Sequence, residues 1–164
     1  MKSALPLACA FVLACNSTPD SGAGPAQGER SVTPTTLQGP VELLEPQAGD
    51  VKEAVVAAMI AAAPRNHRVV VYVGASWCEP CERFREAAKA GKLDTQFPGV
   101  SLLVFDVDRD RDRLAAAGYK STYIPLLVLP KADGSASAHK MEGGQKGEGA
   151  VAQMAPRLTQ LLTH

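Results

Sequence analysis

Residues 69–81 read VVVYVGASWCEPC. The run at residues 69–73 is apolar without polar alternation, which is typical of a strand covered on both faces of a sheet. Residues 74–77 predict a turn, and Pro80 suits an early helical position, so a helix is expected over residues 82–90. The sequence therefore predicts a buried strand, a turn that carries two cysteines, and a helix in direct succession.

Strands and helices also alternate on both sides of this stretch. Asp50 with Glu53 resembles a capping box and predicts a helix over residues 50–63. The strand at 69–73 and the next buried strand are expected to be parallel, because such crossovers are right-handed. The later elements are expected as a strand at 100–107, a helix at 110–117, strands at 126–129 and 135–141 around a turn at 132–134, and a helix at 151–162 that Pro156 kinks or divides. The fold class is α/β.

The chemistry of the chain is concentrated in Trp77-Cys78-Glu79-Pro80-Cys81. Two thiols separated by two residues at a helix start can form a disulfide and reopen it with little backbone movement. Free backbone N–H groups and the helix dipole favour the thiolate of Cys78. Cys78 is therefore expected to attack a substrate disulfide and Cys81, one turn deeper, to resolve the mixed disulfide. This exchange needs no cofactor.

Two other interpretations of the cysteine pair stay open. A CxxC is half a zinc site, but His67, His139 and His164 are scattered and no second CxxC follows, so no metal is expected. A structural disulfide is the other alternative, and the placement at a helix start argues against it.

These features together resemble the thioredoxin superfamily over about residues 50–164. The resemblance implies a three-layer fold, with a central mixed sheet flanked by helices, and a thiol-disulfide oxidoreductase. Ile124-Pro125 falls where that family places a cis-proline facing the cysteines, and the resemblance implies that backbone groups of Ile124 pair with a substrate strand. It also favours Trp77 as a partly exposed apolar platform for substrate rather than simple packing.

The chain departs from the family pattern at three positions. Tyr72 aligns with a buried aspartate that assists the deeper cysteine, and Val104 lies near the family's usual lysine. Between the cysteines, where Glu79 and Pro80 are the candidates for tuning the thiol pKa, Glu79 replaces a glycine. A carboxylate beside Cys78 disfavours its thiolate and makes the couple more reducing, which predicts a reductase.

The N-terminus has the pattern of an export signal. Lys2 precedes a short apolar run, and Val12-Leu13-Ala14-Cys15 resembles a lipobox, in which cleavage precedes a cysteine that is lipidated. We expect a signal peptide at 1–14, then the lipidated Cys15 and a flexible tether to residue 49, rich in Pro, Gly, Ser and Thr. An ordinary secretory signal is the alternative. Either way the sequence predicts export to the cell envelope, on the periplasmic side where two membranes exist.

The balance of acidic and basic residues excludes some classes of binding partner. Seventeen Lys and Arg balance seventeen Asp and Glu, so no nucleic-acid partner is expected. The alternating charges of residues 106–113 lack the glycine and glutamate of a calcium loop and predict a solvated charge run. The expected partners are a disulfide-containing exported protein, an upstream membrane thiol electron donor, and the membrane itself through Cys15. A disulfide oxidant or isomerase, or a non-enzymatic Cu(I)- or client-binding module, stays open as the alternative function.

Overall fold

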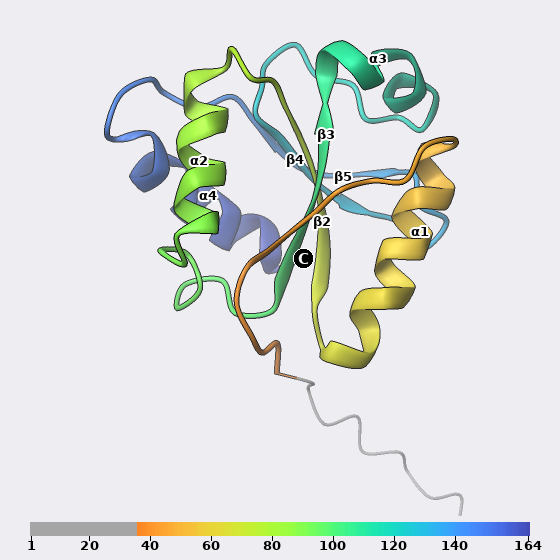
Figure 1. The fold of residues 1–164 in the computed structure, drawn as a ribbon, viewed down its shortest axis with the longest axis horizontal. Coiled ribbons are helices and arrows are strands. Elements are labelled where there is room, and N and C mark those ends of the chain that lie inside the picture. The colour runs from red at the N-terminus through yellow and green to blue at the C-terminus, as the bar shows by residue number, and fades with distance from the viewer. Residues whose placement is uncertain (1–35) are drawn as a thin grey trace, which may run out of the picture. The chain divides into compact units, whose positions relative to one another are not determined.

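The computed structural model of the protein describes residues 36–164. Its centre is a mixed sheet with strand order β1-β3-β2-β4-β5 (Figure 1). β1, β3 and β2 run parallel, and β4 and β5 add an antiparallel hairpin at the other edge. The elements are β1 (Glu42–Leu44), α1 (Val51–Ala62), a 3-10 turn (Ala63–Arg65), β2 (Arg68–Gly74), α2 (Glu79–Lys89), β3 (Val100–Asp106), α3 (Val107–Ala116), β4 (Leu126–Pro130), β5 (Ala136–Glu142) and α4 (Ala150–Leu162).

Helices cover both faces of the sheet, so the expected three-layer α/β architecture is confirmed. Tyr72 of β2 faces α2 and α4, where it packs in one core with Phe84 and Met154. Its neighbour Val71 faces α1 and α3, where it packs in a second core with Leu114. Because both faces are covered, successive residues 69–74 of β2 are all buried, which explains the apolar run without alternation.

Capping side chains set where the helices begin. Asp50 caps α1 as expected, since its carboxylate accepts the amides of Lys52 (2.8 Å) and Glu53 (3.1 Å). Asp106 caps α3 in the same way, so α3 begins at Val107, before the expected residue 110. α2 likewise begins before the expected residue 82, directly after Cys78.

α4 runs unbroken through Pro156, so of the two expected outcomes, a kink or a division, the division is wrong. Pro156 and Ala152 both lie on the exposed side of the helix. Water can therefore donate a hydrogen bond to the carbonyl of Ala152, which Pro156 leaves without an amide partner. None of the helices among residues 36–164 is long and apolar enough to cross a membrane.

Part of the expected tether belongs to the domain, which corrects the boundary at residue 50. β1 pairs in parallel with β3, from Glu42 opposite Ser101 to Leu44 opposite Leu103. The amide of Val41 also donates to Asp94 (2.9 Å). Backbone pairing thus holds a segment whose composition alone predicts a coil. The expected signal peptide, Cys15 and the first part of the tether lie outside the described residues.

A partly buried polar cluster fixes β1 at the end of the sheet opposite the cysteines. The carboxylate of Glu42 accepts two hydrogen bonds from Arg65 (2.7 and 2.8 Å) and one from the hydroxyl of Ser101 (3.1 Å). Nδ1 of His67 lies 3.0 Å from the same hydroxyl. Gly39 covers this histidine at φ 97°, and a Cβ there would lie 2.8 Å from its Nε2. The chain therefore enters the domain far from the start of α2 (Figure 1).

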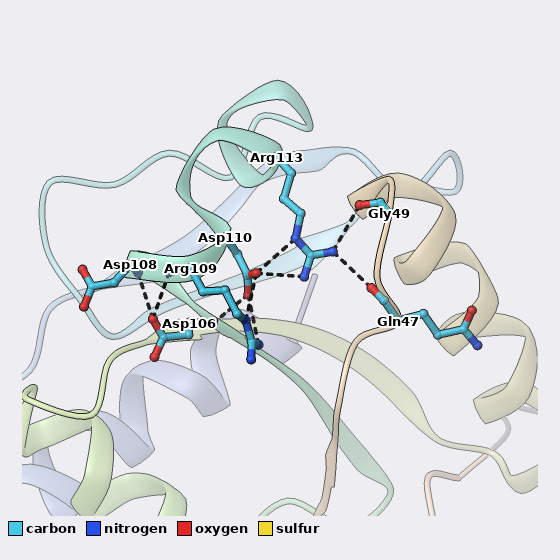
Figure 2. A network of polar contacts seen from close by, with 7 residues as sticks. All are labelled: Gln47, Gly49, Asp106, Asp108, Arg109, Asp110 and Arg113. Atoms are coloured by element: carbon cyan, nitrogen blue, oxygen red, sulfur yellow. Dashed lines mark hydrogen bonds and ion pairs between the residues drawn. The ribbon is translucent and has the colours of Figure 1, made fainter.

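The charge run at residues 106–113 is solvated at Asp108, Arg109, Arg111 and Asp112, as expected, but Asp110 is buried in an ordered network (Figure 2). The side chain of Asp110 is 2% exposed and accepts hydrogen bonds from the amide of Asp106 (3.0 Å) and the guanidinium groups of Arg109 and Arg113. Arg113 also donates to the carbonyls of Gln47 (3.1 Å) and Gly49 (3.2 Å). The network joins α3 to the segment between β1 and α1.

Candidate active site

The two cysteines of residues 77–81 lie where β2 ends and α2 begins. Cys78 and Cys81 form a disulfide with a Cα–Cα distance of 5.2 Å. Cys78 is 5% exposed and Cys81 is fully buried, so the outer sulfur belongs to Cys78. This is the arrangement expected of an attacking and a resolving cysteine.

Cys78 occupies the N-cap of α2. Its carbonyl accepts the amide of Glu82 (3.0 Å), which is the first hydrogen bond of the helix, and its side chain makes no capping hydrogen bond. Amides of the first turn are therefore left without a side-chain partner beside the sulfur. When the disulfide is reduced, these amides and the helix dipole favour the thiolate of Cys78.

Two stacked aromatic side chains, Tyr72 and Phe84, lie in the same core as Cys81. The buried hydroxyl of Tyr72 donates a 3.0 Å hydrogen bond to the carbonyl of Cys81, and its ring stacks on Phe84 with centroids 6.2 Å apart. Burial raises the pKa of Tyr72 far above its ordinary value, so the phenol stays protonated and acts only as a donor. Gly74 has no room for a side chain here, because a Cβ would lie 2.9 Å from Cε1 of Tyr72.

The Ile124–Pro125 peptide bond is cis, as the resemblance implied. Pro125 is buried, and half-buried Ile124 packs against the core that contains both cysteines. The turn is held from two sides: the hydroxyl of Ser121 accepts the amide of Tyr123 (3.0 Å) and contacts Glu142, and the carbonyl of Pro125 accepts the amide of Gly143 (2.8 Å). The hydrogen bond from Ser121 lowers the pKa of Glu142, which favours the charged form.

Two exposed aromatic side chains belong to this region. Trp77 is 67% exposed and precedes Cys78, and Tyr123 is 66% exposed and precedes Ile124. The indole Nε1 of Trp77 donates to Asp108 in the first turn of α3 (2.7 Å). The ring is therefore held at the surface rather than packed in the core, in agreement with a platform for substrate.

The carboxylate of Glu79 accepts hydrogen bonds both from its own helix and from a neighbouring loop. Its Oε1 accepts hydrogen bonds from Nε of Arg83 (2.9 Å) and from the amide of Gly147 (3.1 Å), in the loop between β5 and α4. These hydrogen bonds, first that of Arg83 and then that of Gly147, lower the pKa of Glu79, so the carboxylate is ionised at neutral pH. Pro80 is buried beside the same loop, since a Cβ on Gly144 would lie 3.1 Å from Cβ of Pro80.

Five of the eight expected site residues, Trp77 to Cys81, form the turn that carries the disulfide, and Ile124 and Pro125 lie in a cis turn that Gly143 and Gly144 join to Pro80. Cys15 lies outside the described residues. Within residues 36–164 no group of three or more His, Cys, Asp or Glu side chains is placed to hold a metal ion.

Sequence reasoning missed the residues that support this site. Asp108 lies within the charge run and carries no signal that it would meet Trp77. Gly147 carries no sequence signal that links it to the cysteines, because its contact with Glu79 bridges 68 residues of sequence. Arg83 could have been found, because Glu79 and Arg83 have the i,i+4 spacing of a helical ion pair.

The fold and the cysteine pair define a thiol-disulfide oxidoreductase. The thioredoxin family model matches residues 51–156, and the chain belongs to the thioredoxin family. No curated protein matches the chain at a significant level.

Solved structures of thioredoxins are similar at low identity. A mutant thioredoxin from Halobacterium salinarum NRC-1 is 23% identical, with 72% of this chain and 87% of that chain covered and a TM-score of 0.44. Oxidised thioredoxin O1 from Arabidopsis thaliana is 23% identical, with 74% and 97% covered and a TM-score of 0.46. The thioredoxin of Trichomonas vaginalis is 19% identical, with 74% and 96% covered and a TM-score of 0.48.

Proposed function

We propose that this protein reduces disulfides of exported proteins, held at the cell envelope by a lipid on Cys15. In the reduced protein, the Cys78 thiolate attacks one sulfur of a substrate disulfide. The substrate S–S bond breaks and its second sulfur leaves as a thiolate. The Cys81 thiolate then attacks Sγ of Cys78, which releases the first substrate sulfur and forms the Cys78–Cys81 disulfide. Two electrons and two protons have passed to the substrate.

The observation that carries the direction of transfer is the ionised carboxylate of Glu79 beside Cys78. A negative charge next to the attacking sulfur opposes its thiolate, so the reduced form is less stabilised and the couple more reducing. Arg83 balances part of this charge, but along the chain Glu79 is the nearer of the two to Cys78. Both side chains are about two-fifths exposed, so solvent screens each of them.

The aromatic and cis-proline residues support a polypeptide substrate. Trp77 and Tyr123 offer exposed ring surface on the two segments that carry Cys78 and Ile124. Ile124 and Pro125 shape the site, and backbone groups of Ile124 would pair with an extended substrate strand, as a sheet edge pairs with a peptide.

Export and anchoring rest on the sequence pattern that ends at Cys15. The described chain enters the domain at the end of the sheet opposite the cysteines, where the carbonyl of Gly39 accepts the amide of Gly99 (2.9 Å). A reductase outside the cytosol also needs an upstream membrane thiol carrier, which returns two electrons and two protons to the disulfide.

The deciding experiment measures the reduction potential and insulin reduction of the full chain with Cys9 and Cys15 replaced by serine. A potential of about −220 mV or lower with turnover supports a reductase, and about −120 to −180 mV indicates an oxidant or isomerase. Thiols without turnover and with tight one-to-one Cu(I) binding indicate a binding module. The Cys78→Ser variant must abolish turnover.

Anchoring is tested separately in the native chain. Mass spectrometry of the membrane fraction should find a lipid-modified N-terminal Cys15, and Cys15→Ser should move the protein to the soluble fraction. A chain cleaved elsewhere, with an unmodified Cys15, would refute the anchor but leave the redox activity in place.

A further inference from the structure

The loop of residues 143–149, which joins β5 to α4, lies between the two halves of the active site. At its first residue, the amide of Gly143 donates to the carbonyl of Pro125, in the cis-proline turn (2.8 Å). At its far end, the amide of Gly147 donates to the carboxylate of Glu79, in the first turn of α2 (3.1 Å). Two hydrogen bonds thus tie one loop to the segments that carry Ile124 and Cys78.

The first residues of the loop are firmly held without Glu79. Arg157 of α4 donates to the carbonyls of Glu142 and Gly143 (both 2.7 Å). Gly144 then fits closely against Pro80 and Met154, since a Cβ at Gly144 would lie 3.1 Å from atoms of both. Because Gly144 has no side chain, the loop backbone there lies directly on the start of α2.

The far end of the loop depends on Glu79. Gly147 has φ 88°, and a Cβ there would meet no atom within 4 Å, so packing does not hold it. Besides the backbone hydrogen bond from Ala150 to its carbonyl, its described polar contact is the one with Glu79. Arg83 holds the same carboxylate oxygen, so the acceptor is already oriented toward the loop.

We infer that Glu79 is a positioning residue, which fastens the far end of loop 143–149 to the first turn of α2, beside the cysteine that a substrate must reach. This inference rests on the proposed function for the identity of the ligand, which is a peptide segment that contains a disulfide. The positioning role depends on the Glu79 oxygen that accepts the amide of Gly147, so it is distinct from any effect of the negative charge on Cys78. Freeing this end would loosen residues 145–149 beside the start of α2 and weaken substrate binding more than the chemical step.

Two substitutions separate the acceptor from the charge. Glu79→Gln keeps an oxygen that accepts the amide of Gly147 and removes the charge, whereas Glu79→Ala removes both. Glu82→Ala is the matched control, because Glu82 is also an acidic residue of the first turn of α2. Its carboxylate lies 3.7 Å from the guanidinium of Arg85 on the same helix and makes no described hydrogen bond to the loop.

The full chain, with Cys9 and Cys15 replaced by serine, is measured by amide hydrogen exchange at Gly147 and by insulin-reduction kinetics. Compared with Glu79→Gln, which also lacks the charge, Glu79→Ala should speed Gly147 exchange about three- to tenfold and raise KM by a similar factor, as expected for loss of one hydrogen bond. Glu82→Ala should match the parent in both, and Glu79→Gln should match it in the exchange at Gly147. Unchanged exchange or unchanged KM in Glu79→Ala would overturn the inference. So would a Glu79→Gln variant in which Gly147 exchanges as fast as in Glu79→Ala. If the parent does not reduce insulin, the proposed function fails, and exchange at Gly147 still decides whether Glu79 holds the loop.

Discussion

The indole of Trp77 and the carboxylate of Asp108 form a 2.7 Å hydrogen bond between the turn before Cys78 and the first turn of α3. The ring remains 67% exposed, so this bond, rather than burial, fixes its orientation beside the disulfide. An oriented apolar surface next to the reacting sulfur is ready to receive a substrate side chain without a further loss of side-chain entropy.

Asp108→Ala should release the Trp77 ring and weaken substrate binding. Trp77 is the only tryptophan of the chain, so its fluorescence reports this site directly. We expect a changed emission maximum, a faster anisotropy decay and a KM for insulin raised about two- to fivefold, the effect of one lost hydrogen bond to a charged group. Asp112→Ala, an exposed residue of the same helix, is the control and should leave all three unchanged. An emission spectrum equal to the parent's in Asp108→Ala would contradict this role.

Tyr72→Phe should lower stability and leave the pH dependence of the reaction unaltered. The substitution keeps the ring that stacks on Phe84 and removes the hydroxyl that donates to Cys81, a loss of about 1 kcal/mol in the free energy of unfolding. Because burial keeps the phenol protonated, it can take no proton from Cys81 near neutral pH. Denaturant unfolding and the pH profile of kcat/KM between about pH 6 and 9 test both statements. A shifted pH profile in Tyr72→Phe would show that the phenol does take part in proton transfer.

The overall fold could be predicted because its signals are local. The apolar run at 69–73, the cap at Asp50 and the cysteines at a helix start each specify their own element, and both faces of the sheet then follow from burial. The resemblance placed Ile124-Pro125 opposite the cysteines, and the cis bond is confirmed.

The contacts that complete the site could not be predicted, because each joins residues far apart in sequence. Asp108 meets Trp77 across 31 residues, and Glu79 meets Gly147 across 68. β1 was missed for a related reason. Three residues in a segment rich in proline and glycine give no periodic signal, and the strand is stabilised by Ser101 and Arg65, which come later in the chain.

Glu42→Ala should loosen β1 without disturbing the disulfide site. The substitution removes the hydrogen bonds from Arg65 and Ser101, and we expect a loss of about 1–2 kcal/mol in the free energy of unfolding. Amides of residues 42–44 should exchange faster, while insulin reduction stays at the parent rate. Glu45→Ala, at an exposed position nearby, is the control and should have no effect on either. Protection of residues 42–44 that equals the parent's would show that strand pairing alone holds the segment.

Asp110→Asn should destabilise the domain and flatten its response to acid. Burial of Asp110 acts to raise its pKa, but hydrogen bonds from Arg109, Arg113 and the amide of Asp106 outweigh it and hold the pKa below the ordinary 3.8. Since the folded pKa is the lower one, the carboxylate contributes stability above pH 3.8 and loses it as the pH falls further. We expect Asp110→Asn to cost about 2 kcal/mol at neutral pH, and less in acid below the ordinary pKa. Urea unfolding at about pH 7 and about pH 3 measures both, with Asp112→Asn as the control. An equal cost at both pH values would assign the loss to packing rather than to charge.

Arg83→Gln should raise the pKa of the Cys78 thiol and make the couple more reducing. Arg83 neutralises part of the carboxylate of Glu79 through a 2.9 Å ion pair, and its removal leaves the negative charge free to oppose the thiolate of the neighbouring Cys78. Glu79→Gln should shift both quantities in the opposite direction, and the double variant Glu79→Gln with Arg83→Gln should resemble Glu79→Gln, because the guanidinium then has no carboxylate to neutralise. Thiolate absorbance during a pH titration of the reduced protein, together with the reduction potential, gives the two readouts. If Arg83→Gln instead lowers the pKa, Glu79 does not control the sulfur, and the direction of electron transfer would need another cause.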